Sequence, residues 1–229
     1  MNYQTPRGTY DILPEEMNAW HDVEDVIKEV TRVYRYQEIR TPYFESTNVF
    51  KRENDSSDMV NKEMYTFQMG SDSYTLRPEG TAGVIRAMFR HERPQKGRQR
   101  QFTQFGVENI GAKSPELDAE TIALGYDIVK KMGISSVKVL INTLGDDDSR
   151  SAYREALKKH FEPHLDELCS DCHRRFEQNP LRILDCKVDH DLDCMKQAPS
   201  LSEYLNDESK EYFARVLKAL DALGIPYEI

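Results

Sequence analysis

Polar and aromatic side chains of the kinds that bind nucleotides are concentrated in residues 88–108. Arg90 offers a planar guanidinium that can bind two oxygens of a phosphate or a carboxylate. Phe102 offers a ring on which a base can stack, and Gln104 and Glu108 offer acceptors for an ammonium group. These residue types suit a site that binds a nucleotide and an amino acid together, as amino-acid adenylation requires.

A β-hairpin is predicted to position these side chains. Pro94 and Gly97 bracket a turn, and the residues on either side of it suit strands. If the second arm is extended, its side chains alternate between two faces. One face would carry Phe102, Gln104, Gly106 and Glu108, and the other Gln101, Thr103, Phe105 and Val107. The alternative is an exposed basic hairpin, because runs of Lys and Arg are usually solvated surface.

Several blocks of the chain resemble the histidyl-tRNA synthetase family. Residues 89–108, which include FRHERPQKGR, are similar to the second signature motif of its bacterial members. Residues 75–82 (TLRPEGTA), preceded by residues 62–67, resemble the segment that contacts histidine and ATP. Residues 6–14 resemble the start of the family, and residues 38–42 the end of its dimer-forming first motif. The resemblance runs along essentially the whole chain.

This resemblance implies a fold, a reaction and a set of site residues. The fold would be α+β, with the antiparallel sheet of class II aminoacyl-tRNA synthetases flanked by helices and a mixed inserted subdomain. A homodimer would activate histidine with ATP and Mg²⁺ and transfer it to tRNA(His). Arg90 would be catalytic. Histidine would contact Glu79, Gly80, Thr81, Gln104 and Glu108; ATP would contact Arg90, Glu92, Arg98 and Phe102; no residue is assigned to a metal.

Each of these roles has a purely structural alternative. Glu79 could pair with Arg77 or Arg86, Gln104 could satisfy backbone groups, and Phe102 could belong to the core.

The chain also departs from the family pattern. Residues 82–87 run directly into residues 88–90, where the family has a helix and a strand, which predicts an internal deletion near residues 87 and 88. The family's third motif and anticodon-binding domain are absent from the printed residues, and residues 52–55 lack the usual glycine-rich loop. We therefore expect a catalytic fragment whose ligase activity truncation can impair. The alternatives are a non-catalytic histidine sensor or regulatory subunit, and a structural fragment that binds neither ligand.

Composition is compatible with this interpretation. At 229 residues and 38% hydrophobic content, the chain can bury the core of one large domain or of one domain with an insert. A net charge of -9 disfavours a nonspecific nucleic-acid coat, so any RNA contact must be local. There is no secretion signal and no apolar run of about eighteen residues, so we expect a cytoplasmic protein without membrane contact.

Apolar periodicity predicts the elements around the hairpin. A first helix should begin near Pro14, and a second should end at Gly133. A buried strand is expected at residues 137–142, a helix at 149–161 and a last helix ending at Gly224. The predicted apolar stripes are Trp20, Val23, Val26, Ile27, Val30, Val33 and Tyr34; Ala119, Ile122, Ala123, Tyr126 and Val129; and Tyr212, Val216, Leu217, Leu220 and Leu223. We place the catalytic core at residues 1–148 and the insert, with the return to the core, at residues 149–229.

Four cysteines, Cys169, Cys172, Cys186 and Cys194, lie in the predicted insert. Four thiols can close a tetrahedral zinc site, with His173 and His190 as nearby substitutes. However, seven residues separate Cys186 from Cys194, where a zinc site of this type has two. Reduced, non-catalytic thiols are therefore favoured over structural zinc, and a redox-active pair is less favoured still.

Overall fold

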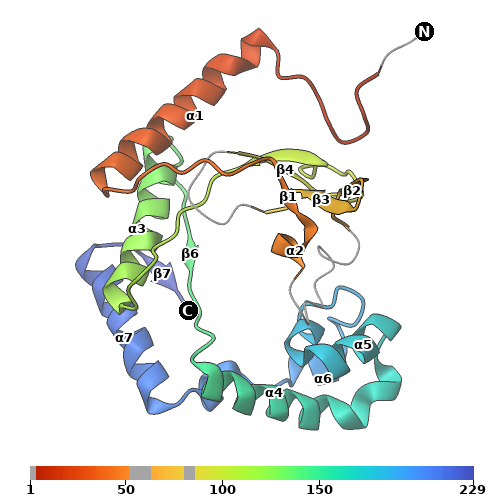
Figure 1. The fold of residues 1–229 in the computed structure, drawn as a ribbon. Helices are drawn as coiled ribbons and strands as arrows, with labels where there is room; N and C mark the ends of the chain where they lie inside the picture. Colours follow the sequence, from red (N-terminus) through yellow and green to blue (C-terminus); the bar gives the residue numbers. More distant parts are fainter. Residues whose placement is uncertain (1–3, 52–62, 80–85) are drawn as a thin grey trace. The chain divides into compact units, whose positions relative to one another are not determined.

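The structure, a computed structural model, describes residues 4–51, 63–79 and 86–229. The chain forms two compact units, residues 1–137 and 138–229 (Figure 1). The division lies ahead of the predicted boundary at residues 148 and 149. Val139 and Leu140 pair with residues 227–228. The segment that precedes the predicted insert therefore belongs to the second unit.

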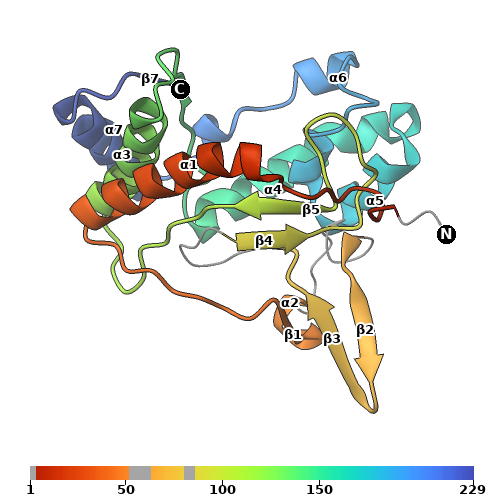
Figure 2. The same ribbon diagram turned by 90° about the horizontal axis from the view of Figure 1, so that it is seen from above.

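The first unit contains the elements expected of an α+β fold. In order, they are α1 (Pro14–Val33), β1 (Phe44–Ser46), α2 (Thr47–Phe50), β2 (Thr66–Met69), β3 (Asp72–Leu76), β4 (Arg86–Phe89), β5 (Gln101–Gln104) and α3 (Pro115–Lys131). Strands β1, β3 and β2 form one antiparallel sheet in that order, and β4 and β5 form a second antiparallel pair (Figure 2). The predicted fold class is confirmed.

Helix α1 begins at Pro14, as predicted, because proline needs no donor at the first helical position and Glu15 and Glu16 favour the positive helix end. From the predicted stripe, Ile27 and Val30 are buried, and they pack on Leu124 and Ile128 of α3. Val23 and Val33, however, are 41% and 67% exposed. The stripe therefore packs within its own unit through Val26, Ile27, Val30 and Tyr34, whereas Val23 and Val33 are exposed.

The apolar face predicted for α3 is partly wrong. Ala119 and Ala123 are buried as expected, but the other buried positions are Pro115, Leu124 and Ile128, and Ile122, Tyr126 and Val129 are only half-buried. The face is rotated because α3 turns Leu124 and Ile128 toward α1. The helix stops before Gly133, whose φ of 86° is the left-handed conformation typical of a helix end.

Helices dominate the second unit. Its elements are β6 (Val139–Leu140), α4 (Asp147–Phe161), α5 (Ser170–Gln178), α6 (Asp193–Lys196), α7 (Asp207–Ala222), β7 (Tyr227–Glu228) and the 3₁₀-helices η2 (Glu162–Glu167), η3 (Pro180–Ile183) and η4 (Leu201–Tyr204). The segment predicted to be mixed is thus helical between α4 and α7. None of the helices in the described residues is long and apolar enough to cross a membrane.

The buried strand predicted at residues 137–142 is much shorter than expected. Only Val139 and Leu140 pair with β7, in parallel, and Leu140 is 71% exposed. Such a short pairing leaves the Leu140 side chain in solvent. The neighbouring Ile141 is buried, at 9% exposure. The core of this unit lies elsewhere, around Phe161 and Ile183, which are fully buried.

Helices α4 and α7 begin next to each other and share their caps. Asp146 caps α4 by accepting from the Ser149 N–H at 2.8 Å, and Asn206 caps α7 by accepting from the Ser209 N–H at 2.8 Å. The Asn206 amide also donates to Asp146 at 2.6 Å. Gly145 must remain glycine here, because its φ is 64° and a Cβ would lie 2.8 Å from both Leu205 and Ser149.

The shared cap should make the second unit sensitive to acid. The hydrogen bond from the Ser149 N–H, followed by that from Asn206, lowers the pKa of Asp146 to about 2. A lowered pKa contributes stability that is present above the unfolded value of about 3.9 and is lost as the pH falls to about 2. Asp146→Asn keeps a good cap but cannot titrate, so it should lose less stability over this pH range. Helical circular dichroism during urea unfolding at pH 4 and pH 2 measures the difference.

The matched control for this experiment is Asp148→Asn, an exposed acid in the first turn of the same helix. It should behave as the unmodified chain does. An equal pH response in the Asp146 and Asp148 variants would contradict the assignment.

Candidate active site

Arg77 holds the two sheets of the first unit together at the candidate site. Its side chain is 2% exposed, and its Nε and Nη1 atoms donate to the carbonyls of Ala87 and Thr41 at 2.9 and 3.0 Å. Its guanidinium also lies 4.4 Å from the centre of the Tyr43 ring. Its own backbone carbonyl accepts from the Phe89 N–H at 3.0 Å. Sequence reasoning missed this role, because a buried arginine that donates to backbone carbonyls of distant segments has no periodic pattern in the sequence.

Arg90, the predicted catalytic residue, lies where the two family-like blocks meet. Its Nε donates to the carbonyl of Pro78 at 2.8 Å, and its guanidinium carbon lies 5.1 Å from the centre of the Phe102 ring. The side chain is 29% exposed. Arg90 is therefore oriented by two fixed partners while part of its guanidinium remains accessible to a ligand.

The segment preceding β2 reaches the same place. The His91 N–H donates to the carbonyl of Glu63 at 2.7 Å, and the rings of Tyr65 and His91 meet edge-on with centres 5.3 Å apart. Residues that are far apart in the sequence thus converge on the arm that carries Arg90.

Glu92 lies between two guanidinium groups. Its Oε1 is 3.6 Å from Nη1 of Arg90, and its Oε2 is 3.3 Å from Nη1 of Arg98. Glu92 is 15% exposed, whereas Arg98 is 56% exposed. Phosphate oxygens could replace the carboxylate as partners of either arginine, because guanidinium binds both groups in the same geometry.

The predicted hairpin is confirmed. Strands β4 and β5 are antiparallel, with Met88 opposite Phe102, and Gln95 and Arg98 are bridged across the turn. Gly97 in this turn has a φ of 80°, which glycine adopts without strain. The turn sets Arg98 on the arm opposite Arg90, and this explains how the two cations reach one carboxylate.

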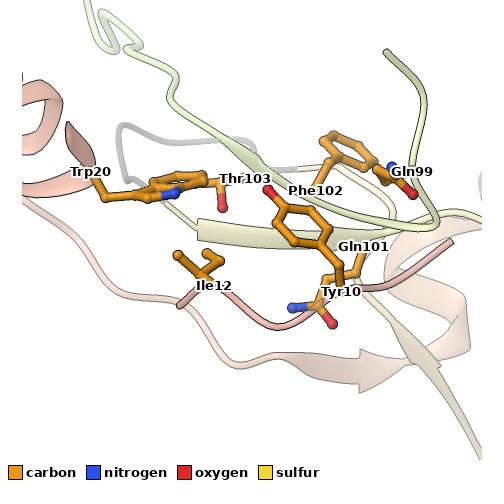
Figure 3. Close-up of a pocket in the computed structure, with 7 residues that line it drawn as sticks. All are labelled: Tyr10, Ile12, Trp20, Gln99, Gln101, Phe102 and Thr103. Carbon is orange, nitrogen blue, oxygen red and sulfur yellow. The ribbon is translucent and has the colours of Figure 1, made fainter. Parts of the chain in front are cut away.

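A small pocket lies beside β5 (Figure 3). It has a volume of about 120 Å³ and is lined by Tyr10, Ile12, Trp20, Gln99, Gln101, Phe102 and Thr103. Drug-sized ligands usually occupy about 300 Å³ or more. The pocket can therefore hold part of a nucleotide but not a whole one.

The face predicted for the second hairpin arm is wrong beyond Gln104. Strand β5 ends at this residue, so Gly106 and Glu108 do not continue the alternation, and Glu108 is exposed. The chain leaves the sheet because Phe105 and Val107 pack against the hydrophobic cluster of α1 and α3. Both side chains are half-buried there, and this packing takes the place of further strand pairing.

The predicted histidine contacts are only partly brought together. Gln104 is half-buried on the same face of β5 as Phe102. Glu79 is half-buried and follows Pro78, whose carbonyl binds Arg90. Gly80 and Thr81 lie outside the described residues. Among the predicted ligand contacts in the described residues, Arg90, Glu92, Arg98 and Phe102 contact one another.

A preformed Mg²⁺ site is not found near Arg90 in the described residues. The carboxylate of Glu92 already faces two guanidiniums, and the described clusters of metal-ligating side chains lie in the second unit. Mg²⁺ commonly binds through substrate phosphates and only one or two carboxylates. A Mg²⁺ ion at this place would therefore need ligands from a bound phosphate group.

Residues 8–223 match the family described as histidyl-tRNA synthetase. The chain belongs to the histidyl-tRNA synthetase family. It is 52% identical, over 252 aligned positions, to histidine--tRNA ligases of Listeria monocytogenes serotype 4b and Bacillus subtilis. The alignments cover all of this chain and 59% of each relative. The chain thus spans less than two thirds of the length of these ligases.

Solved synthetase structures agree with the family assignment. The chain matches the apo Staphylococcus aureus histidyl-tRNA synthetase with a TM-score of 0.76 and 40% identity, over 99% of this chain and 56% of that one. A Bacillus halodurans structure named as an ATP phosphoribosyltransferase regulatory subunit/histidyl-tRNA synthetase matches with a TM-score of 0.62 and 18% identity, over 98% of this chain and 65% of that one. At that identity, the second match supports the fold alone.

The alignments also show that this chain is shorter inside the matched region. They span 252 positions against its 229 residues, so 23 positions of the synthetase relatives have no counterpart here. The predicted deletion between Ala87 and Met88 falls within β4, where both residues pair with β5. Met88 is 2% exposed, so the strand across this junction is packed. The place of the deletion stays a prediction.

The four cysteines separate into two groups in the second unit. Cys169, Cys172 and Cys186 gather with Asp189, whereas Cys194 lies with His164 and Glu167. The set of four thiols, which the sequence offered only as the less favoured alternative, is therefore not brought together, because a carboxylate takes the fourth place. Burial raises the pKa of the Cys172 thiol, which favours its protonated form in the absence of a cation.

Proposed function

We propose that this chain carries the histidine-activating part of a histidine–tRNA ligase. The observation that carries the proposal is the setting of Arg90, whose guanidinium is fixed by the Pro78 carbonyl and lies against Phe102 and Glu92. The 52% identity to histidine--tRNA ligases along the whole chain supports it. In the reaction of this family, negative charge develops in the transition state, and Arg90 would stabilise it.

In the proposed reaction, the carboxylate of histidine attacks the α-phosphorus of ATP. The bond from this phosphorus to the bridging oxygen breaks, and pyrophosphate leaves with the electron pair. Arg90 would hold the α-phosphate and the reacting carboxylate together and neutralise charge in the transition state. No protein nucleophile is needed. The adenylate would then acylate the end of tRNA(His).

The remaining assignments follow the same scheme. Phe102 would stack the adenine, and Arg98 and Glu92 would contact the more distal part of ATP. Histidine would be recognised by Glu79, Gly80, Thr81, Gln104 and Glu108. Hydrogen bonds placed for a neutral imidazole would reject other side chains better than pocket volume could.

We also propose that the active protein is a cytoplasmic homodimer with histidine, ATP and tRNA(His) as its ligands. The first unit would supply the activation site. The helical second unit would correspond to the insertion that approaches the tRNA. A regulatory, histidine-sensing role is the alternative, but the structure whose name includes a regulatory subunit is only 18% identical to this chain.

Histidine-dependent exchange of pyrophosphate into ATP tests the proposal on the purified chain, with calorimetric binding of histidine and ATP measured in parallel. We expect exchange that requires histidine and is not supported by phenylalanine. Histidine binding without exchange would instead support the sensor. Absence of both binding and exchange would support a structural fragment.

A further inference from the structure

Three thiols and one carboxylate converge within the second unit. The three cysteine sulfurs and an oxygen of Asp189 all lie within 4.8 Å of one another, and each of Cys169 and Cys172 contacts the other three groups. Cys172, Cys186 and Asp189 are buried, at 0%, 5% and 5% exposure. The buried carboxylate of Asp189 accepts from the Cys169 N–H at 3.1 Å, and a cation would compensate its charge further.

The distances match those between the ligands of tetrahedral zinc. With Zn–S bonds of about 2.3 Å and a Zn–O bond of about 2.0 Å, a tetrahedron places two sulfurs about 3.8 Å apart and a sulfur and an oxygen about 3.5 Å apart. The sulfurs of Cys169 and Cys186 are 3.7 Å apart, and Cys186 Sγ is 3.5 Å from Asp189 Oδ2. A zinc ion would therefore require little rearrangement of the ligands.

The ligands come from two short chain segments with the same spacing. Cys169 and Cys172 are separated by two residues, as are Cys186 and Asp189, and thirteen residues lie between the pairs. In each pair, the backbone N–H of the second member is hydrogen-bonded to the sulfur of the first. Two pairs with this spacing are typical of a structural zinc site. The second pair cannot be recognised from cysteine spacing alone, because its last member is an aspartate.

The surroundings suit the charge of such a site. Cys169 is the N-cap of α5, so the positive end of this helix faces the thiolates. Arg175, one turn along α5, is hydrogen-bonded to Cys172 and donates to the carbonyl of Arg182 at 3.1 Å. Three thiolates and a carboxylate exceed the charge of Zn²⁺, and Arg175 would offset part of the excess.

We propose that Cys169, Cys172, Cys186 and Asp189 form a structural zinc site that fastens the start of α5 to residues 186–189. Thiolate ligands favour zinc over magnesium or calcium. The elements that carry the ligands or lie next to them in the sequence, α5, η3 and α6, are short helices. A metal that joins two segments of such a unit adds its binding free energy to folding.

Metal analysis of the purified chain, followed by Co²⁺ substitution, tests this site. We expect about one zinc per chain and, after substitution, the visible bands of tetrahedral cobalt with a sulfur-to-cobalt charge-transfer band. Asp189→Ala should weaken zinc binding by about 100-fold or more. Asp189→Cys should retain the metal and strengthen the charge-transfer band, because a sulfur then replaces the oxygen.

Cys194→Ser is the matched control, since Cys194 is equally buried, at 3% exposure, but lies outside the cluster. It should keep its zinc, whereas Cys186→Ser should lose it. If the Cys186 variant does not fold, chelation of the unmodified chain gives the answer, because zinc must raise the melting temperature of a fold that holds it. A chain without zinc, a melting temperature indifferent to zinc, or equal zinc loss in the Cys194 variant would overturn the proposal.

Discussion

Arg90→Ala is expected to lower histidine-dependent pyrophosphate exchange by about 100-fold or more. The guanidinium is already oriented by the Pro78 carbonyl at 2.8 Å and is only partly exposed, so little reorganisation is needed when charge develops on the α-phosphate. Alanine removes this charge and also the donor to the carbonyl of buried Pro78, whereas Glu92 keeps its contact with Arg98. The decrease should appear in the activation rate, and circular dichroism checks that the variant is folded.

Two further variants sharpen the interpretation of Arg90. Arg90→Lys retains the charge but cannot bind two oxygens in a plane, so it should recover only part of the rate. Lys96→Ala removes a cation from the exposed turn of the same hairpin and should leave exchange unchanged. Exchange near the unmodified rate in the Arg90→Ala variant would refute a catalytic role, and an equal loss in the Lys96 variant would indicate only a general effect of charge.

Arg77→Met is expected to destabilise the first unit by about 3 kcal/mol. The substitution leaves the carbonyls of Ala87 and Thr41 without their charged donor, and each such loss costs about 1–3 kcal/mol. Relief from burying the guanidinium offsets part of this cost. Urea unfolding followed by the fluorescence of Trp20, the only tryptophan of the chain, reports on this unit selectively.

The control for Arg77 is Arg40→Met. The side chain of Arg40 is 72% exposed and pairs with Glu38 at 2.9 Å on the surface. Its replacement should change stability by no more than about 0.5 kcal/mol. Arg77→Lys should remain strongly destabilised, since an ammonium group cannot span both carbonyls. A stability loss in the Arg77→Met variant no larger than in the Arg40 variant would contradict the bracing role.

Elements with local sequence signals could be predicted before the structure was known. Pro14 with the acids after it sets the start of α1, and Gly133 sets the stop after α3. Pro94, Gly97 and the flanking strand residues predicted the hairpin. The types and order of Arg90, Glu92, Arg98 and Phe102 predicted the family and the candidate site, and the structure joins these four side chains.

The length of each strand or apolar face, and the contacts between distant segments, became known from the fold. Alternation along the second hairpin arm stops at Gln104 because Phe105 and Val107 bury themselves against distant helices. The buried face of α3 is the one that contacts α1, and it differs from the face that the spacing of apolar residues predicted. Arg77 braces two sheets, and Asp189 completes a cluster of cysteines, through contacts between segments distant in sequence. Such long-range contacts depend on packing, which neither spacing nor composition records.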